Sequence, residues 1–212
     1  MAFATDSDLL AYEPRVFEDV PIPGQQRLRV TDAAIAGTTL SSAAADFEAA
    51  RVEPGAVVLV ADAALEVIER VDANTLTVSQ PRAAGSDAPI APSARAALTA
   101  TVRTFAPQTA VVHAALLREL GIETDDADAA LTADAIVTES VMTALEALGT
   151  LAAVYALAVS VVGDNETIRA KAAHYRQQFA MRKRAARVLI DTDGDGRADV
   201  VRQPGVTTLR RV

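Results

Sequence analysis

Four aspartates near the end of the chain have the spacing of a calcium-binding loop. The stretch DTDGDGRADVV contains Asp191, Asp193, Asp195 and Asp199. In an EF-hand loop these residues would occupy ligand positions 1, 3, 5 and 9, with Gly196 at the sharp turn of position 6. Arg202 stands at position 12, where a bidentate glutamate belongs, so the match to an EF-hand is incomplete. Calcium binding by the four aspartates is one interpretation of this pattern.

A metal-free turn is the other interpretation of the same residues. The runs VLI and ADVV on either side of the loop are of β type, which predicts a hairpin with DGDG at its tip. Glycine would supply the positive φ angles that such a tip needs. We favour the turn, because calcium loops with this reduced ligand set occur in tandem and the chain has one copy.

Other residues that could do chemistry form no catalytic constellation. His113 and His174 are the only histidines, and neither has a serine or paired carboxylate nearby on its predicted helix. Cysteine is absent, which excludes disulfides and thiolate chemistry. The chain also contains no GxGxxG, Walker or HExxH motif. We therefore expect no enzymatic activity and, apart from the calcium alternative, no cofactor.

Charge is distributed unevenly along the chain. Residues 1–168 carry 9 basic and 24 acidic groups, whereas residues 169–212 carry 11 basic and 4 acidic groups. The acidic run at residues 123–130 is typical of a solvated loop. The basic run at residues 182–187 has few aromatic neighbours, so we expect it to face solvent or a protein partner instead of nucleic acid. Such segregation favours an oriented interaction surface, including self-association through opposite patches.

Hydrophobic periodicity predicts an α+β fold that is mainly α. Short helices are expected in residues 1–24, the first one capped by Thr5 or Asp6, followed by a small inserted β domain at residues 25–82. A proline-rich linker leads into a helical bundle core at residues 83–190. Residues 191–212 are expected to form the Asp-rich hairpin and a C-terminal arm.

The longest apolar run lies in the predicted helical core. Residues 147–163 are uncharged, which is at the lower limit for crossing a bilayer. The run is rich in alanine, lacks basic flanks and is bounded by Glu146 and Asp164. We expect a helix buried on all sides and no membrane insertion. The N-terminus has early acidic residues and no apolar signal region, so no secretion signal is expected.

Three stretches of the chain, taken together, resemble the head-tail connector proteins of tailed bacteriophages and gene transfer agents. They are TDSDLLAYEPRVF, VRTFAPQTAVVHAALLRELGI and LGTLAAVYALAVSVVGDNETIRAKAAHYRQQFAMRKRAARVLIDTDGDGRAD. The family comprises adaptor, or head completion, proteins that form a ring below the portal. The β domain is similar to a small domain inserted in some members.

The resemblance implies a structural protein of the virion neck, made in the host cytoplasm. A ring, usually dodecameric, would join the capsid portal to a tail-proximal neck or stopper protein and let DNA pass through its lumen without sequence-specific binding. The portal would be bound by a C-terminal arm containing Arg202, Gln203, Pro204, Val206, Leu209, Arg210, Arg211 and Val212. The alternative is a calcium-binding interaction module of a surface or secreted protein, acting through residues 191–199.

Overall fold

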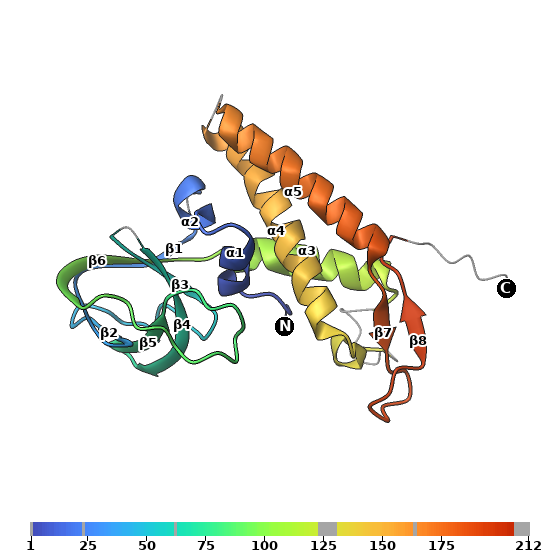
Figure 1. The fold of residues 1–212 in the computed structure, drawn as a ribbon, viewed down its shortest axis with the longest axis horizontal. Helices are drawn as coiled ribbons and strands as arrows, with labels where there is room; N and C mark the ends of the chain where they lie inside the picture. Colours follow the sequence, from blue (N-terminus) through green and yellow to red (C-terminus); the bar gives the residue numbers. More distant parts are fainter. Residues whose placement is uncertain (1, 23, 62, 123–130, 163–164, 206–212) are drawn as a thin grey trace. The chain divides into compact units, whose positions relative to one another are not determined.

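The chain divides into two compact units. The computed structural model describes residues 2–22, 24–61, 63–122, 131–162 and 165–205. One unit comprises Thr5–Ala106, and the other comprises Met1–Ala4 together with Pro107–Val212 (Figure 1). We refer to them as the barrel unit and the helical unit.

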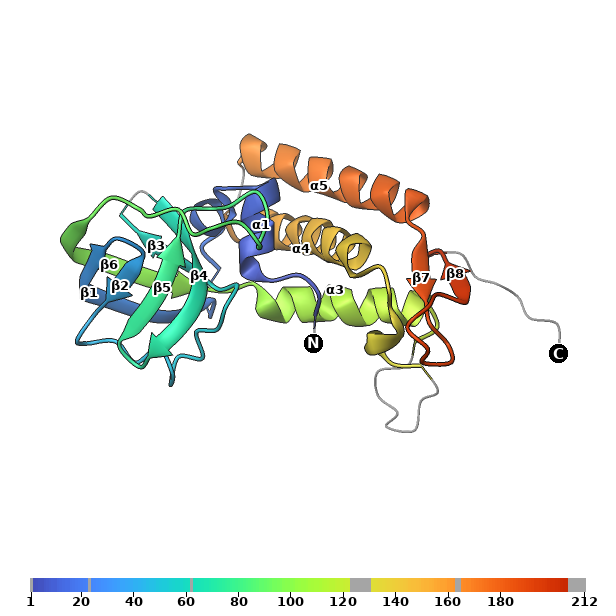
Figure 2. The ribbon, with the colours of Figure 1, turned by 60° about the horizontal axis from the view of Figure 1, so that its bottom comes forward.

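The barrel unit is built on a closed antiparallel barrel of six strands (Figure 2). Around the barrel the strands follow the order β1-β2-β5-β4-β3-β6, and β6 pairs with β1 to close it. Their bounds are β1 Gln26–Ala36, β2 Thr39–Ser41, β3 Val57–Val60, β4 Ala63–Asp72, β5 Thr75–Ser79 and β6 Arg95–Arg103. Closure removes the free strand edges that an open sheet would expose.

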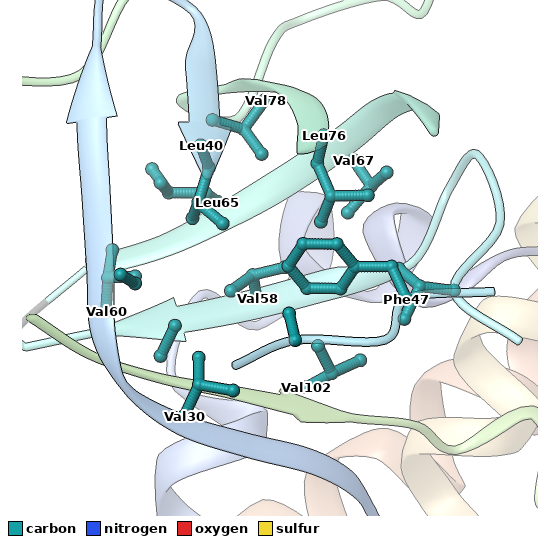
Figure 3. Packing of buried hydrophobic residues seen from close by; sticks show 14 of the residues in the cluster. Val30, Leu40, Phe47, Val58, Val60, Leu65, Val67, Leu76, Val78 and Val102 are labelled. Carbon is teal, nitrogen blue, oxygen red and sulfur yellow. The ribbon is translucent and has the colours of Figure 1, made fainter. Parts of the chain in front are cut away.

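Branched aliphatic side chains fill the barrel around one phenylalanine. Phe47, from the connection between β2 and β3, is fully buried and lies among the inward side chains of the strands (Figure 3). Leu76 and Val78 are buried on either side of the less buried Thr77 in β5, which is the period expected of a strand with one buried face. Valine and leucine suit these positions because they pack well on a pleated surface.

The two short N-terminal helices belong to the barrel unit. Helix α1 (Asp6–Tyr12) begins at the Thr5 cap, which confirms the predicted start, and α2 spans Val16–Asp19. The Phe17 and Phe105 rings lie 4.8 Å apart, and Arg103 Nη1 donates to the Phe17 carbonyl at 2.6 Å. The expectation that residues 1–24 are helices of a bundle core is therefore wrong for α1 and α2.

Helices α3 (Ala106–Glu119), α4 (Glu139–Val162) and α5 (Glu166–Ala185) form most of the helical unit. Helix α4 runs beside α5 in both views (Figures 1 and 2). A Cβ at Gly149 of α4 would lie 2.6 Å from Val112 of α3 and 3.1 Å from Phe179 of α5. Glycine at this position therefore permits the three helices to approach one another closely.

By length and composition alone, α4 is the one described helix that is long and apolar enough to cross a membrane. Of its apolar stretch, 61% is buried within the protein. Every residue from Ala144 to Leu151 is buried. This burial agrees with the expected core helix in its central turns. Towards its end, Leu157 and Val161 are 45% and 55% exposed.

The predicted fold class is wrong, because a closed barrel, and not a helical bundle, forms half of the architecture. Of the described residues, 37% are in helices and 27% in strands. The main error lies at β6, whose sequence RAALTATVR was assigned to the helical core after a predicted β domain ending at residue 82. Its alanines are of helical composition, yet the strand pairs with both β1 and β3. Pairing in the sheet overrides local preference here.

Candidate functional site

The Asp-rich stretch is the tip of a hairpin, as predicted. Strands β7 (Val188–Ile190) and β8 (Val200–Arg202) pair in antiparallel register on either side of it. Gly194 and Gly196 have φ angles of +79° and +83°, which glycine adopts at little cost.

Backbone N–H groups of the loop surround the Asp191 carboxylate. Its Oδ2 accepts from Gly196 at 2.7 Å, and its Oδ1 accepts from Gly194 at 2.8 Å and from Asp193 at 3.2 Å. These bonds, that of Gly196 above all, lower the pKa of Asp191 below its ordinary value of 3.8. Hydrogen bonds within the loop thus stabilise the ionised form of the Asp191 carboxyl.

The structure brings together three of the four predicted calcium ligands. One carboxylate oxygen from each of Asp191, Asp193 and Asp195 lies within 4.8 Å of the others. Asp199 is directed elsewhere, because its Oδ2 accepts from the Thr192 N–H at 2.8 Å and hydroxyl at 2.9 Å. Calcium takes about six to eight oxygen ligands, so these three carboxylates fit it only in part.

Arg202, which stands at the twelfth loop position, binds the core and not the loop. Its Nη1 donates to the carbonyls of Leu120 and Gly121, just beyond the end of α3. A Cβ at Gly121 would lie 3.1 Å from this nitrogen, so the glycine leaves room for the guanidinium. A cation at a helix C-terminus is favoured by the helix dipole.

The first residues of the predicted portal-binding arm therefore lie within the fold. Arg202 belongs to β8, Gln203 Nε2 donates to the Arg184 carbonyl, and Pro204 is buried. The remaining predicted arm residues, Val206, Leu209, Arg210, Arg211 and Val212, lie outside the described residues, as does the acidic run at 123–130.

Arginines collect where α5 meets the hairpin. Arg182 and Arg184 are exposed in the last turn of α5, and Arg187 Nη1 donates to Gln203 Oε1 at 2.9 Å. Within the described part of the chain, no carboxylate forms an ion pair with any of these three arginines or with Arg202. Lys183, by contrast, pairs with Glu119 at 2.9 Å. We call Arg182, Arg184, Arg187 and Arg202 the basic cluster.

Sequence reasoning missed a polar centre in the helical unit. Glu146, which has no exposed surface, accepts from the N–H groups of Phe3 and Ala4 at 2.7 and 2.9 Å. Its other oxygen lies 2.7 Å from His113 Nδ1, and the Phe3 and His113 rings lie 5.6 Å apart. Glu146 lies on α4 and His113 on α3, so a search along the helix of His113 does not find this partner. The signal was a single acid inside an apolar helix, since a buried charge needs a partner.

The hydrogen bonds of this polar centre hold the N-terminal segment against α4. One helical turn further on, the Thr150 hydroxyl donates to that of Thr109 at 3.2 Å, which continues the polar contact between α4 and α3. His174, the second histidine, is exposed on α5, with its ring 5.1 Å from that of Tyr175.

Comparison of the chain with protein-family models, with curated proteins and with solved structures found no match.

Proposed function

We propose that the chain is a structural connector subunit of a phage-like particle. Copies of it form a ring that joins the capsid portal to the tail and lets DNA pass through the lumen. The proposal assigns no reaction to the chain, and its partners are the portal, a tail-proximal neck protein and further copies of itself. It places the protein in the head-tail neck of the virion.

The end of the helical unit is the observation that carries this proposal. Helix α5 continues through Ala186 and Arg187 into the hairpin, and the hairpin ends beside the basic cluster. The chain thus presents a group of arginines where the hairpin ends, next to the point where residues 206–212 begin. The sequence of residues 206–212 contains two further arginines. Such a surface suits an acidic partner protein.

The uneven distribution of charge along the chain also supports a ring. Residues 5–106 carry 8 basic and 14 acidic groups, and the basic groups concentrate instead at the end of α5 and beyond. Surfaces of opposite sign on one chain permit head-to-tail contacts between identical subunits, and such contacts close into a ring when the rotation fits. An acidic surface would also let DNA slide, because phosphate binding depends on cationic contacts.

The proposal is tested with a chain shortened to residues 1–205 and with the portal protein encoded beside it. We expect the shortened chain to keep its folded circular-dichroism spectrum, because the described hydrogen bonds of the hairpin end at Gln203. We also expect it to lose portal binding in a sedimentation assay. A matched pair of full-length variants replaces Arg210 and Arg211 by glutamate or by lysine, and only the glutamate pair should lose binding.

Undiminished portal binding by the shortened chain would contradict the role of residues 206–212. A full-length chain that neither binds portal nor assembles would contradict the connector function itself.

A further inference from the structure

The two outer edges of the C-terminal hairpin differ in their backbone pairing. The outer edge of β7 is filled, because Val137 N–H donates to the Leu189 carbonyl at 2.9 Å and Leu189 N–H donates to Thr138 Oγ1 at 3.0 Å. Ile136 also forms a bridge with Ile190. The segment before α4 therefore closes this side of the hairpin.

The outer edge of β8 is unpaired within the described residues. Among the described strands β8 pairs with β7 alone, and Leu189 lies opposite Val201. Both polar backbone groups of Leu189 point away from β8, so the alternation of an antiparallel ladder directs those of Val201 away from β7. The Val201 side chain is 57% exposed. An N–H donor, a carbonyl acceptor and an apolar side chain are thus presented together.

Charge beside the edge favours one kind of occupant. Arg202 follows Val201 directly, and Gln203 links the Arg184 carbonyl to the Arg187 side chain. The guanidinium groups of Arg187 and Arg202 donate to neutral oxygens, so their positive charge is not neutralised by the bonds that position them. A strand with acidic side chains would meet complementary charge along this edge.

We infer that the free edge of β8 receives an extended acidic segment of the portal protein as a third strand. This inference rests on the connector function proposed above and supplies its mode of recognition. Backbone bonds to Val201 give the added strand its register, and the basic cluster selects carboxylate side chains over other sequences. Addition of a strand to an exposed edge is an established way for proteins to bind extended peptides.

Val201→Pro tests the edge without breaking the hairpin. Proline removes an N–H that points away from β7, and an edge strand tolerates it at such a position. We expect about tenfold weaker portal binding from the lost bond and the added ring. Val201→Thr, which keeps the N–H and the β-branched shape, should bind as the wild type does. Circular dichroism should show the same folded spectrum for both variants.

Arg184→Glu tests the charge, because the Arg184 side chain is exposed and the contact of Gln203 is to its backbone. We expect weaker portal binding, with the largest loss at low salt, and wild-type binding for Arg184→Lys.

Three results would overturn the inference. If wild type binds portal and Val201→Pro binds it equally well, the edge is not the site, and the connector function stands. If Val201→Pro instead changes the mass of the chain alone, the edge pairs with a second copy. If the wild type does not bind portal at all, both the connector function and this inference fail.

Discussion

Replacement of Asp6 by asparagine should stabilise the barrel unit at neutral pH. Asp6 is 7% exposed at the start of α1, and its Oδ1 accepts from the Phe105 N–H at 2.8 Å. Burial raises the pKa of this carboxyl from 3.8 to about 6, although hydrogen bonds from Thr104 and Phe105 and the charge of Arg27 act in the opposite direction. The ionised form is therefore disfavoured in the folded state.

The sign of the pH dependence follows from this raised pKa. Between pH 3.8 and about 6 the folded chain holds a proton on Asp6 that the unfolded chain has lost, so stability falls as the pH rises through this window. The shift corresponds to about 3 kcal/mol, all of it lost above the folded pKa. Asparagine keeps an oxygen for the Phe105 N–H and carries no charge, so it should recover much of this free energy.

Urea unfolding followed by circular dichroism at pH 4.5, 6 and 7.5 measures the difference between wild type and Asp6→Asn. We expect the variant to be more stable at pH 7.5 and the advantage to shrink towards pH 4.5. Asp8→Asn is the control on the same helix, where the Asp8 carboxylate accepts from the Thr5 N–H and hydroxyl. It should lower stability by about 1 kcal/mol at pH 7.5. A variant Asp6→Asn that is less stable than wild type at pH 7.5 would refute the reasoning.

Two further substitutions test the strained and buried positions of the fold. Ala97 has a φ of +54° within β6, so Ala97→Gly should raise the free energy of unfolding by about 0.5–1 kcal/mol. The control Ala96→Gly should lower it by a similar amount. Equal effects of the two substitutions in urea titrations would contradict backbone strain at Ala97. Glu146→Ala leaves the N–H groups of Phe3 and Ala4 without their acceptor. It should therefore destabilise the helical unit by about 3–5 kcal/mol and remove amide-exchange protection at both residues. Unchanged protection would show that Glu146 does not hold the N-terminal segment.

Sequence pattern predicted the elements whose ends carry strong local signals. Asparagine before a helix and glycine after one are signals of this kind. Asn165 caps α5, with its Oδ1 accepting from the Ile168 N–H at 3.2 Å, and Gly121 ends α3 with a φ of +66°. The hairpin was predicted from glycine at its tip and β-type residues on both sides. These signals are contained within a few residues, so they can be read without knowledge of the rest of the fold.

The failures concern elements whose conformation is set by distant partners. Thr132 is of a residue type typical of a helix cap, yet no long helix begins there. Ile136 and Val137 pair with β7 instead, and α4 begins only at Glu139. The bond between His113 and Glu146 likewise joins residues 33 positions apart.

At the candidate site, the positions of the loop aspartates could be predicted but the direction of each side chain could not. Asp199 turns to Thr192, and Arg202 turns to the end of α3. The open edge of β8 depends on which edge of β7 is filled, and that filling comes from residues some fifty positions earlier in the chain. A pattern read along the chain carries no information on such pairing.

The most direct test of the connector proposal is the mass of the purified full-length chain in solution, alone and with the portal protein, in the presence of a calcium chelator. We expect a closed multi-subunit ring, formed by the chain alone or upon portal addition, because the opposite charges of the chain are satisfied by neighbouring copies and by portal. A chain that stays monomeric at high concentration under both conditions would contradict the proposal.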